Sequence, residues 1–357
     1  MKIAMLTDSF MEGGGLAYIR QVVEGLPQHS FVVCGLGGSA ADAFRRLPNA
    51  VIEPAGYGPA IVRRYGPDLL HFNHLRPLAA HCRCPGSLPL PSINTVHGIH
   101  LRRYDFLRAP WYRLAAIARR LLERHCLAKV SLNIALTESD RDYLLTKLGV
   151  RRTVVIPNGV AALDRAQIKP VPRTAKVHFL VPARFDFQKG HDVLLRAIAL
   201  VKHELLATGA QFDLLGEGSL VPAMGRLARR LDIAGLVRFH GFQSNVADWM
   251  ASTDCVVLPS RWEGLPFVLL EAGRMARAVI CSDASGNIDV ADHGRCATLF
   301  RNGDAQDLAA RLSDYLVCGP ASEVRLALQS RVERVYTMPQ MLRQLGAVYT
   351  SIQAGGR

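Results

Sequence analysis

The regular alternation of short apolar runs with amphipathic helical stretches is the feature that most limits the fold of this 357-residue chain. Twelve strand-like runs recur along the sequence, and helical patterns fill the gaps between them, for example over 16–26, 138–148, 191–206 and 323–335. Strands that alternate with helices form a parallel sheet with helices on both faces. Twelve strands are too many for one tidy open sheet, so we expect two doubly wound α/β domains.

The strand-like runs fall into two sets, separated by the polar, proline-containing stretch 162–174. We therefore expect a first domain over 1–165, a second over 172–336, and a final helical segment within 337–357. Ligands of open parallel sheets bind beyond the carboxyl ends of the strands, so two such sheets facing one another would place a site in the cleft between them. The runs cover 2–7, 31–35, 68–72, 92–96, 131–136 and 153–156 in the first set, and 177–183, 211–215, 236–240, 255–258, 278–282 and 297–300 in the second.

Most of the candidate ligand-binding residues follow the fourth run of the second set, 255–258. Pro266 suits the first position of a helix, because the N–H that it lacks would go unused there. The amides of Phe267 and Val268 then have no partner within the helix and lie at the positive end of its dipole, where phosphate binds. Glu271 lies on the same helix face and could accept hydrogen bonds from a ribose diol, while Glu263 could reach a second polyol. Together these groups could hold a nucleotide-sugar.

Two cations follow the first run of the same set. Arg184 and Lys189 lie in the loop after that run and before a helix, at the end of the sheet where ligands bind. They could neutralise a pyrophosphate, with arginine as a fork and lysine as a point charge. A solvated basic loop is the alternative interpretation. The acidic helix motif in the same half favours the ligand site.

The first set offers weaker signals. Gly14 and Gly15 follow the first run and open a helix, so the backbone could approach a ligand closely, although a simple tight turn explains them equally well. His97 ends another run and could bond a sugar hydroxyl, or it could be a structural histidine. The pairs His97/His100 and His71/His74 have no carboxylate at ligand spacing, so we expect no metal site.

Positive charge is concentrated in the first half. The net charge is +13, and the stretch 102–129 holds eight basic and two acidic residues. Within it, 111–129 reads as an amphipathic helix in which Arg119, Arg120 and Arg124 alternate with leucine and isoleucine. Such a helix could lie on anionic lipid, or it could be the solvated outer face of the domain. Because the sequence has no nucleic-acid motif and few clustered aromatic residues, we expect no nucleic-acid partner.

The hydropathy pattern predicts a cytoplasmic protein. Asp8 interrupts the first apolar run after five residues, so we expect no signal peptide. No stretch of 18 or more uncharged apolar residues occurs, so we expect no membrane-spanning helix. The basic helix adds the expectation of peripheral binding to the inner face of the cytoplasmic membrane.

In its motifs the chain resembles the family 4 (group 1) glycosyltransferases of GT-B fold. The resemblance covers most of the chain and is strong in the second half, where VPARFDFQKGHDVLLRAI, DLLGEGSL, VRFHGF and DCVVLPSRWEGLPFVLLEAG occur in the order and spacing of the family. The first half carries the weaker matches GGG, PDLLHFNH, TVHG, IALTESDRDYL and VIPNGV. The resemblance implies two Rossmann-like domains facing a cleft, and a last helix that crosses back to the first domain.

The resemblance also implies roles for single residues. Arg184 and Lys189 would hold the donor diphosphate, Glu271 the ribose, and Glu263 the transferred sugar. His97 would touch the donor sugar from the opposite domain. The remaining positions would line the donor site: Gly14 and Gly15 on the phosphate and acceptor side, Gly241 and Phe242 around the base, and the backbone of Gly264, Leu265, Pro266, Phe267 and Val268 beside the phosphates and the sugar.

The resemblance finally implies a reaction. The chain would be an enzyme that transfers a sugar with retention of configuration from a nucleotide-sugar, most simply a UDP-sugar, without a metal or another cofactor. The acceptor would be a saccharide or a polyprenyl- or lipid-linked saccharide in bacterial cell-surface glycan synthesis: lipopolysaccharide, O-antigen, capsule or exopolysaccharide. Two departures, Ala161 where the family often has Asp and Ile288-Asp289 in place of Pro-Glu, leave the donor sugar open. The alternatives are a nucleotide-sugar epimerase of the same architecture and a non-catalytic binding protein.

Overall fold

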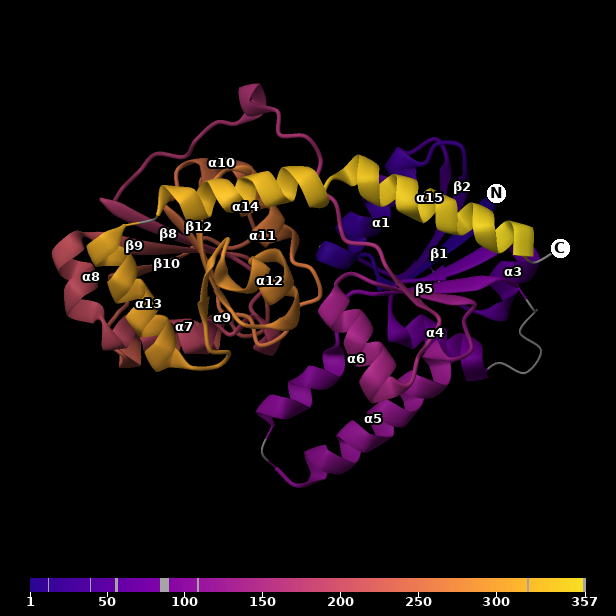
Figure 1. Cartoon of the computed structure of the whole chain (residues 1–357), viewed down its shortest axis with the longest axis horizontal. Coiled ribbons are helices and arrows are strands. Elements are labelled where there is room, and N and C mark those ends of the chain that lie inside the picture. The colour runs from indigo at the N-terminus through magenta and orange to yellow at the C-terminus, as the bar shows by residue number, and fades with distance from the viewer. Residues whose placement is uncertain are drawn as a thin grey trace. The chain divides into compact units, whose positions relative to one another are not determined.

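The computed structural model describes residues 1–11, 13–38, 40–54, 57–83, 90–107, 109–319 and 321–355 (Figure 1). Contacts between residues divide the chain into two compact units. The first contains Met1–Gly159 together with the segment that begins at Met338, and the second is Val160–Thr337. Each unit is built on one parallel sheet with helices on both faces, so the predicted α/β class is confirmed.

The sheet of the first unit has the order β3-β2-β1-β4-β5-β6-β7 in the described residues. All its neighbouring strands are parallel, and the register pairs Ile3 with Phe31 on one side and with Leu69 on the other. Sequential strands therefore run outward in both directions from the β1/β4 boundary. The strands are β1 (Lys2–Ser9), β2 (Ser30–Leu36), β3 (Ala50–Glu53), β4 (Leu69–Phe72), β5 (Ser92–Val96), β6 (Leu132–Ala135) and β7 (Thr153–Val155).

Helices cover both faces of this sheet (Figure 1). One face is covered by α3 (Pro59–Tyr65), α4 (Leu75–Arg83), the 3-10 helix η1 (His100–Phe106), α5 (Trp111–Leu127) and α6 (Glu138–Leu148). On the other face α1 (Gly14–Gly25) packs against α15 (Met338–Gly355), and α2 (Ala41–Arg45) lies beside β3. The fully buried Tyr349 of α15 and His71 of β4 form a hydrogen bond of 2.8 Å. The last helix is thus part of the first unit.

The sheet of the second unit has the order β10-β9-β8-β11-β12-β13 in the described residues. Its neighbouring strands are again parallel, and the order reverses at the β8/β11 boundary. Ligands of doubly wound sheets bind at such a reversal, beyond the carboxyl ends of the strands. The strands are β8 (Val177–Pro182), β9 (Ala210–Leu215), β10 (Val237–Phe239), β11 (Cys255–Leu258), β12 (Ala278–Ser282) and β13 (Thr298–Phe300).

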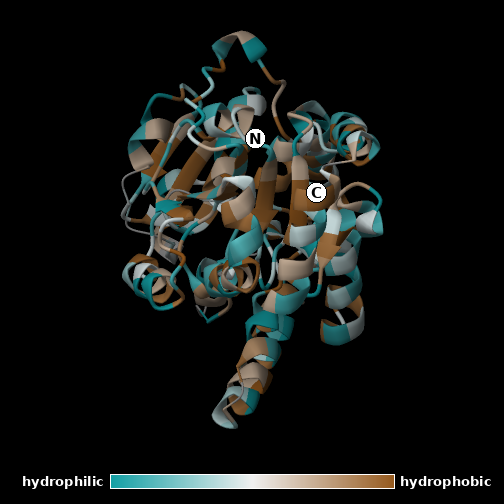
Figure 2. Ribbon diagram, turned by 90° about the vertical axis from the view of Figure 1, so that its left-hand side faces the viewer, coloured by the Kyte–Doolittle hydropathy of each residue, from teal (hydrophilic) through white to brown (hydrophobic). Residues whose placement is uncertain are grey.

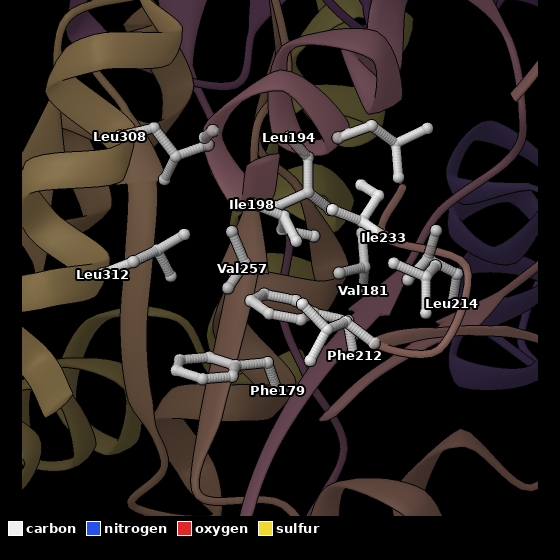
Figure 3. Packing of buried hydrophobic residues seen from close by; sticks show 14 of the residues in the cluster. Phe179, Val181, Leu194, Ile198, Phe212, Leu214, Ile233, Val257, Leu308 and Leu312 are labelled. Atoms are coloured by element: carbon white, nitrogen blue, oxygen red, sulfur yellow. The ribbon is translucent and has the colours of Figure 1, made fainter. Parts of the chain in front are cut away.

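The main core of the second unit lies between one sheet face and the helices α7 (His191–Leu200), α8 (Lys202–Thr208), α9 (Val221–Arg230) and α13 (Ala305–Cys318). Figure 3 shows Phe179 and Phe212 beneath Leu194 and Ile198. The two phenyl rings stack with centroids 4.6 Å apart. Figure 2 shows several strands as largely brown bands, because strands buried on both faces are mostly apolar. On the other face lie α10 (Val246–Ala251), α11 (Phe267–Arg274), α12 (Ser285–Val290) and α14 (Ser322–Val335).

Three details of the sequence prediction were wrong. The short strand β3 was missed, because its apolar run is only three residues long before Glu53. The helix expected over 191–206 is two helices, because Val201 leaves the helical conformation at φ −112° and ψ 24°. Pro266 is the N-cap of α11 in an extended conformation rather than its first helical residue, so the helix begins at Phe267.

Replacing Phe212 by alanine tests the stacked core of the second unit. The side chain is fully buried, so its removal leaves a cavity, and we expect a loss of about 3–5 kcal/mol in the free energy of unfolding. A Trp111→Phe background leaves tryptophan only in the second unit, at Trp249 and Trp262, so urea unfolding followed by fluorescence reports that unit. Val317→Ala at an exposed position of α13 is the control, and an equal loss in both variants would contradict this account.

Candidate functional site

Two loops meet at the carboxyl ends of β8 and β11 in the second unit. The first loop runs from 183 to 189 and the second from 259 to 266. The amide of Arg261 donates to the carbonyl of Gln188 at 2.7 Å, and the side-chain amide of Gln188 donates to the carbonyl of Trp262 at 2.8 Å. Because β8 and β11 are neighbours only at the point where the strand order reverses, the two predicted motifs are brought together there.

An ion pair between Lys189 and Glu263 lies at the centre of this contact. Lysine Nζ is 2.6 Å from Glu263 Oε1, and the hydroxyl of Ser260 donates to the same oxygen at 2.6 Å. The side-chain amide of Gln188 lies 3.5 Å from the other oxygen, Oε2. Glu263 is 5% exposed, so its charge depends on these donors for the stabilisation that water would otherwise give. Part of the Lys189 side chain stays accessible, at 19%. The pair therefore fixes a cation where a ligand can still reach it.

Glycine permits the close approach of the two loops. Gly190 has a left-handed φ of +65°, and a Cβ atom there would lie 2.0 Å from the carbonyl oxygen of Pro259. Gly216, in the loop after β9, is equally close to the first loop, since its Cβ would lie 2.2 Å from the carbonyl oxygen of Ala183. Any other residue at either position would push the loops apart. The loop after β8 thus packs closely against the loop after β11 at Gly190 and against the loop after β9 at Gly216.

The start of α11 offers two unused donors. The amides of Leu269 and Leu270 bond to the carbonyl of Pro266 at 3.1 and 3.4 Å, whereas those of Phe267 and Val268 have no acceptor among the described residues. Such amides, at the positive end of a helix dipole, favour an anion. Before the helix, the backbone of Gly264 and Leu265 lies against α12: a Cβ at Gly286 would overlap the carbonyl oxygen of Gly264.

Glu271 and Arg184 are the two remaining charged residues predicted for this site. Burial raises the pKa of the Glu271 carboxyl, and no donor among the described residues bonds to it, so it can accept hydrogen bonds from hydroxyl groups of a ligand. Arg184 is exposed and lies 3.3 Å from Asp186, a surface pair of little strength. Gly241, at φ +68°, follows β10, and its carbonyl accepts from the amide of Gly216 at 2.7 Å. The adjacent Phe242 is 53% exposed.

Sequence reasoning missed Ser260 and Gln188, which hold Glu263 and the second loop. Gln188 directly precedes the predicted Lys189, and Ser260 lies three residues before the predicted Glu263. The hydroxyl of Ser260 at this short spacing was the one sequence signal for a hydrogen bond to the glutamate. His191 was missed as well. It stacks on Phe185 with ring centroids 4.0 Å apart, and burial, reinforced by the Lys189 charge, lowers the pKa of His191 to about 3. This neutral ring stiffens the first loop.

The first unit places its predicted residues at the corresponding end of its own sheet. Gly14 and Gly15 begin α1, and a Cβ at Gly15 would lie 3.3 Å from the ring of His74. His97 directly follows β5. Its Nε2 is 3.1 Å from Asn73 Oδ1, and its ring is 6.0 Å from that of His74.

Electrostatics define the state of this histidine. Burial lowers the pKa of His97 well below its usual value, and the neighbouring His74, His71 and His100 lower it further. The imidazole is therefore neutral near pH 7 and can exchange hydrogen bonds with a polar ligand without adding charge. Within the described ranges no three His, Cys, Asp or Glu side chains are grouped as metal ligands would be. The absence of a metal requirement is still a prediction.

Two family models match the chain and together span most of both units. The model of Glycosyltransferase Family 4 matches residues 13–162, and the model of Glycosyl transferases group 1 matches residues 176–317. The second match contains Arg184, Lys189, Glu263 and Glu271.

Curated relatives and solved structures agree with these matches. The lipopolysaccharide core biosynthesis glycosyltransferase LpsE of Rhizobium meliloti is 30% identical over 47% of this chain and 47% of its own length, so the match spans about half of that relative. The fold resembles that of sucrose-phosphate synthase from Thermosynechococcus elongatus, with a TM-score of 0.83 at 19% identity over 99% of each chain. It also resembles Anabaena HepE, solved with UDP and glucose, with a TM-score of 0.78 at 18% identity over 98% of this chain and 100% of that one.

Replacing Gly190 by alanine tests the loop contact. The substitution adds a left-handed strain of about 1–2 kcal/mol and a clash with the Pro259 carbonyl. Gly209→Ala is a matched control, because Gly209 has φ +64° but its Cβ would meet only a flexible lysine side chain at 3.5 Å. We expect Gly190→Ala to lower the free energy of unfolding by about 1–3 kcal/mol more than the control in urea titrations. Equal losses of unfolding free energy in the two variants would show that the contact between Gly190 and the Pro259 carbonyl does not restrict the residue at position 190.

Proposed function

The chain belongs to family 4 of the glycosyltransferases, the group 1 glycosyl transferases of GT-B fold, and on this premise we propose that it transfers a sugar with retention of configuration from a nucleotide-sugar to a saccharide acceptor. One observation carries the proposal. A partly accessible cation, Lys189, is held by buried Glu263 at the strand-order reversal of the second unit, and the unused amides of α11 lie in the same region.

The second unit would hold the donor by its charged and hydroxyl-bearing parts. Lys189 and the exposed Arg184 would bind the diphosphate, together with the amides of Phe267 and Val268. The carboxyl of Glu271, which lacks a protein donor among the described residues, would accept hydrogen bonds from the ribose. The exposed ring of Phe242, beside Gly241, would cover the base.

Glu263 takes a role different from a simple sugar ligand. Its Oε1 already accepts from Lys189 and Ser260, so its first task is to hold the lysine in position. Contact of the carboxylate with the transferred sugar stays a proposal. Gly14, Gly15 and neutral His97 stay candidates for the acceptor and sugar side.

The reaction follows from where negative charge develops. The bond between the anomeric carbon and the diphosphate breaks, the acceptor hydroxyl oxygen bonds to that carbon on the same face, and its proton passes to the leaving phosphate. Negative charge grows on the diphosphate as the bond stretches. Lys189 and the amides of α11 are held in place before the reaction begins, and Arg184 adds a second cation, so these groups stabilise the transition state. The leaving phosphate acts as the base, and the protein needs none.

Donor and acceptor are proposed from the relatives. The solved structure of HepE with UDP and glucose supports UDP as the nucleotide. The name of LpsE, a lipopolysaccharide core biosynthesis glycosyltransferase, supports lipopolysaccharide as the glycan that receives the sugar. O-antigen, capsule and exopolysaccharide are the other acceptors that we propose in bacterial cell-surface glycan synthesis. The relatives reported above give no support to the epimerase alternative, and release of free UDP only when acceptor is present would separate transfer from epimerisation.

A membrane surface is proposed as the place of action. Trp111, Leu114, Ile117 and Leu121 of α5 recur at helical spacing and are between 57% and 72% exposed. Basic residues of α5, such as Arg113 and Arg124, flank this apolar stripe, and in Figure 2 the downward projection that contains α5 carries both brown and teal residues. An exposed apolar stripe with flanking cations fits an anionic lipid surface, where a lipid-linked acceptor would lie. No helix of the described residues is long and apolar enough to cross a bilayer.

Replacing Arg184 by glutamine tests the donor site. Arg184 is exposed, so the variant should fold normally, and loss of one charge stabiliser should lower kcat by roughly a hundredfold. The measurement is UDP release from UDP-sugars in the presence of acceptor saccharide, after a thermal-shift screen of UDP-, GDP- and ADP-sugars has identified the donor. Arg226→Gln on the outer surface of α9 is the matched control. An unchanged rate in Arg184→Gln would remove this residue from the site.

Replacing Leu114 and Ile117 together by serine tests the membrane surface. The exposed apolar area falls, so binding to vesicles of phosphatidylglycerol and phosphatidylcholine should weaken by at least roughly tenfold in sedimentation assays. Arg113→Glu with Arg124→Glu should abolish the preference for the anionic lipid. Arg119 and Arg120 are avoided, because they bond to Glu123 and to the carbonyl of Lys147. Leu326→Ser on α14 is the control, and undiminished binding of the α5 variants would refute the surface.

A further inference from the structure

A cavity of about 520 Å³ lies wholly within the first unit, at the carboxyl end of its sheet. Residues of β5, α4, η1 and α5 line it, and Asp8 at the end of β1 and His97 after β5 contribute to its wall. Its volume falls in the range of about 300–1,000 Å³ that is usual for small-molecule sites. The cavity therefore has the size of a ligand site, and its lining shows which ligand chemistry it suits.

Arginines without a carboxylate partner in the described part of the chain dominate the charge of this lining. Arg76 and Arg83 reach the cavity from α4, and Arg103 reaches it from η1. None of the three has a carboxylate partner among the residues that the structure describes. A fourth arginine, Arg119 of α5, is already neutralised by Glu123, with Nε 2.6 Å from Oε1.

The only other carboxylate among the described lining residues is Asp8. Its Oδ1 is buried and accepts no hydrogen bond from the described residues. A buried carboxylate oxygen without a donor is costly unless a ligand hydroxyl supplies one. The cavity thus combines guanidinium groups that have no carboxylate partner with a carboxylate oxygen that has no hydrogen-bond donor among the described residues.

We propose that this cavity binds an acceptor sugar that carries an anionic group, either a phosphate or a carboxylate. Arg76, Arg83 and Arg103 bind the anion, and Asp8 accepts a hydrogen bond from a sugar hydroxyl. The inference rests on the proposed function, because it names the substrate class of the acceptor side.

The same lining disfavours neutral sugars. A neutral ligand would displace water from three guanidinium groups and supply no opposite charge in return. Guanidinium groups stay protonated at all ordinary pH values, so the three arginines keep their positive charge whenever a ligand binds.

Calorimetric titration of the full chain, with saturating UDP, tests the preference. The probes are a hexose 6-phosphate, a hexuronate and the parent hexose, and the two charged probes distinguish a phosphate site from a carboxylate site. At least one charged probe should bind roughly tenfold or more tightly than the hexose, and Arg76→Gln and Arg103→Gln should each remove roughly tenfold of that affinity. Arg63→Gln, at an exposed arginine of α3 outside the cavity, should change nothing. Equal binding of the three probes, or equal loss in the Arg63 variant, would overturn the inference.

Two further measurements separate the possible failures. Asp8→Asn should weaken the charged sugar but leave inorganic phosphate unaffected, and an equal effect on both would reduce the cavity to a simple anion site and overturn the sugar assignment. UDP binding is measured on the same samples. Chains that bind UDP but show no preference for charged sugars would refute this inference alone, whereas chains that bind no nucleotide would refute the proposed function.

Discussion

The contact between the loops after β8 and β11 is the constraint on which the second unit depends. A carbonyl oxygen, that of Pro259, occupies the space where any side chain at position 190 would begin. This contact sets the spacing at which Lys189 reaches Glu263 and at which Arg261 bonds to Gln188. The chemistry at the strand ends is thus fixed by backbone packing, and the side chains add charge to a frame that already exists.

The burial of Glu263 has an energetic logic. A carboxylate with so little exposure needs compensation for lost water, and Lys189 and Ser260 supply it. The lysine is the more accessible partner, so a ligand with several negative charges can share it without leaving the carboxylate unpaired. A cation that is positioned in advance loses little freedom when the ligand arrives, which is the condition for stabilising charge that appears only during a reaction.

Much of the second unit could be read from its sequence, because its signals are local. Strand ends at Pro182 and Leu258 follow from apolar runs, and the adjacent charged residues are then placed by topology alone. The salt bridge between Lys189 and Glu263 could not be read, because it joins loops 74 residues apart. The arginines that line the cavity of the first unit were equally hidden. Arg76 and Arg103 look like ordinary surface residues until the fold brings α4 and η1 to one cavity.

The place of α15 has a consequence for biosynthesis. Tyr349 lies in the core of the first unit, where it bonds to His71, and Leu342 contacts Gly25 of α1. The sheet that is translated first therefore lacks part of its cover until the last helix has left the ribosome. During that interval the second unit, which is continuous in sequence, can complete its own core. Until α15 has been synthesised, the nascent first sheet would present an apolar face to chaperones, and removal of α15 would destabilise the sheet that begins with β1.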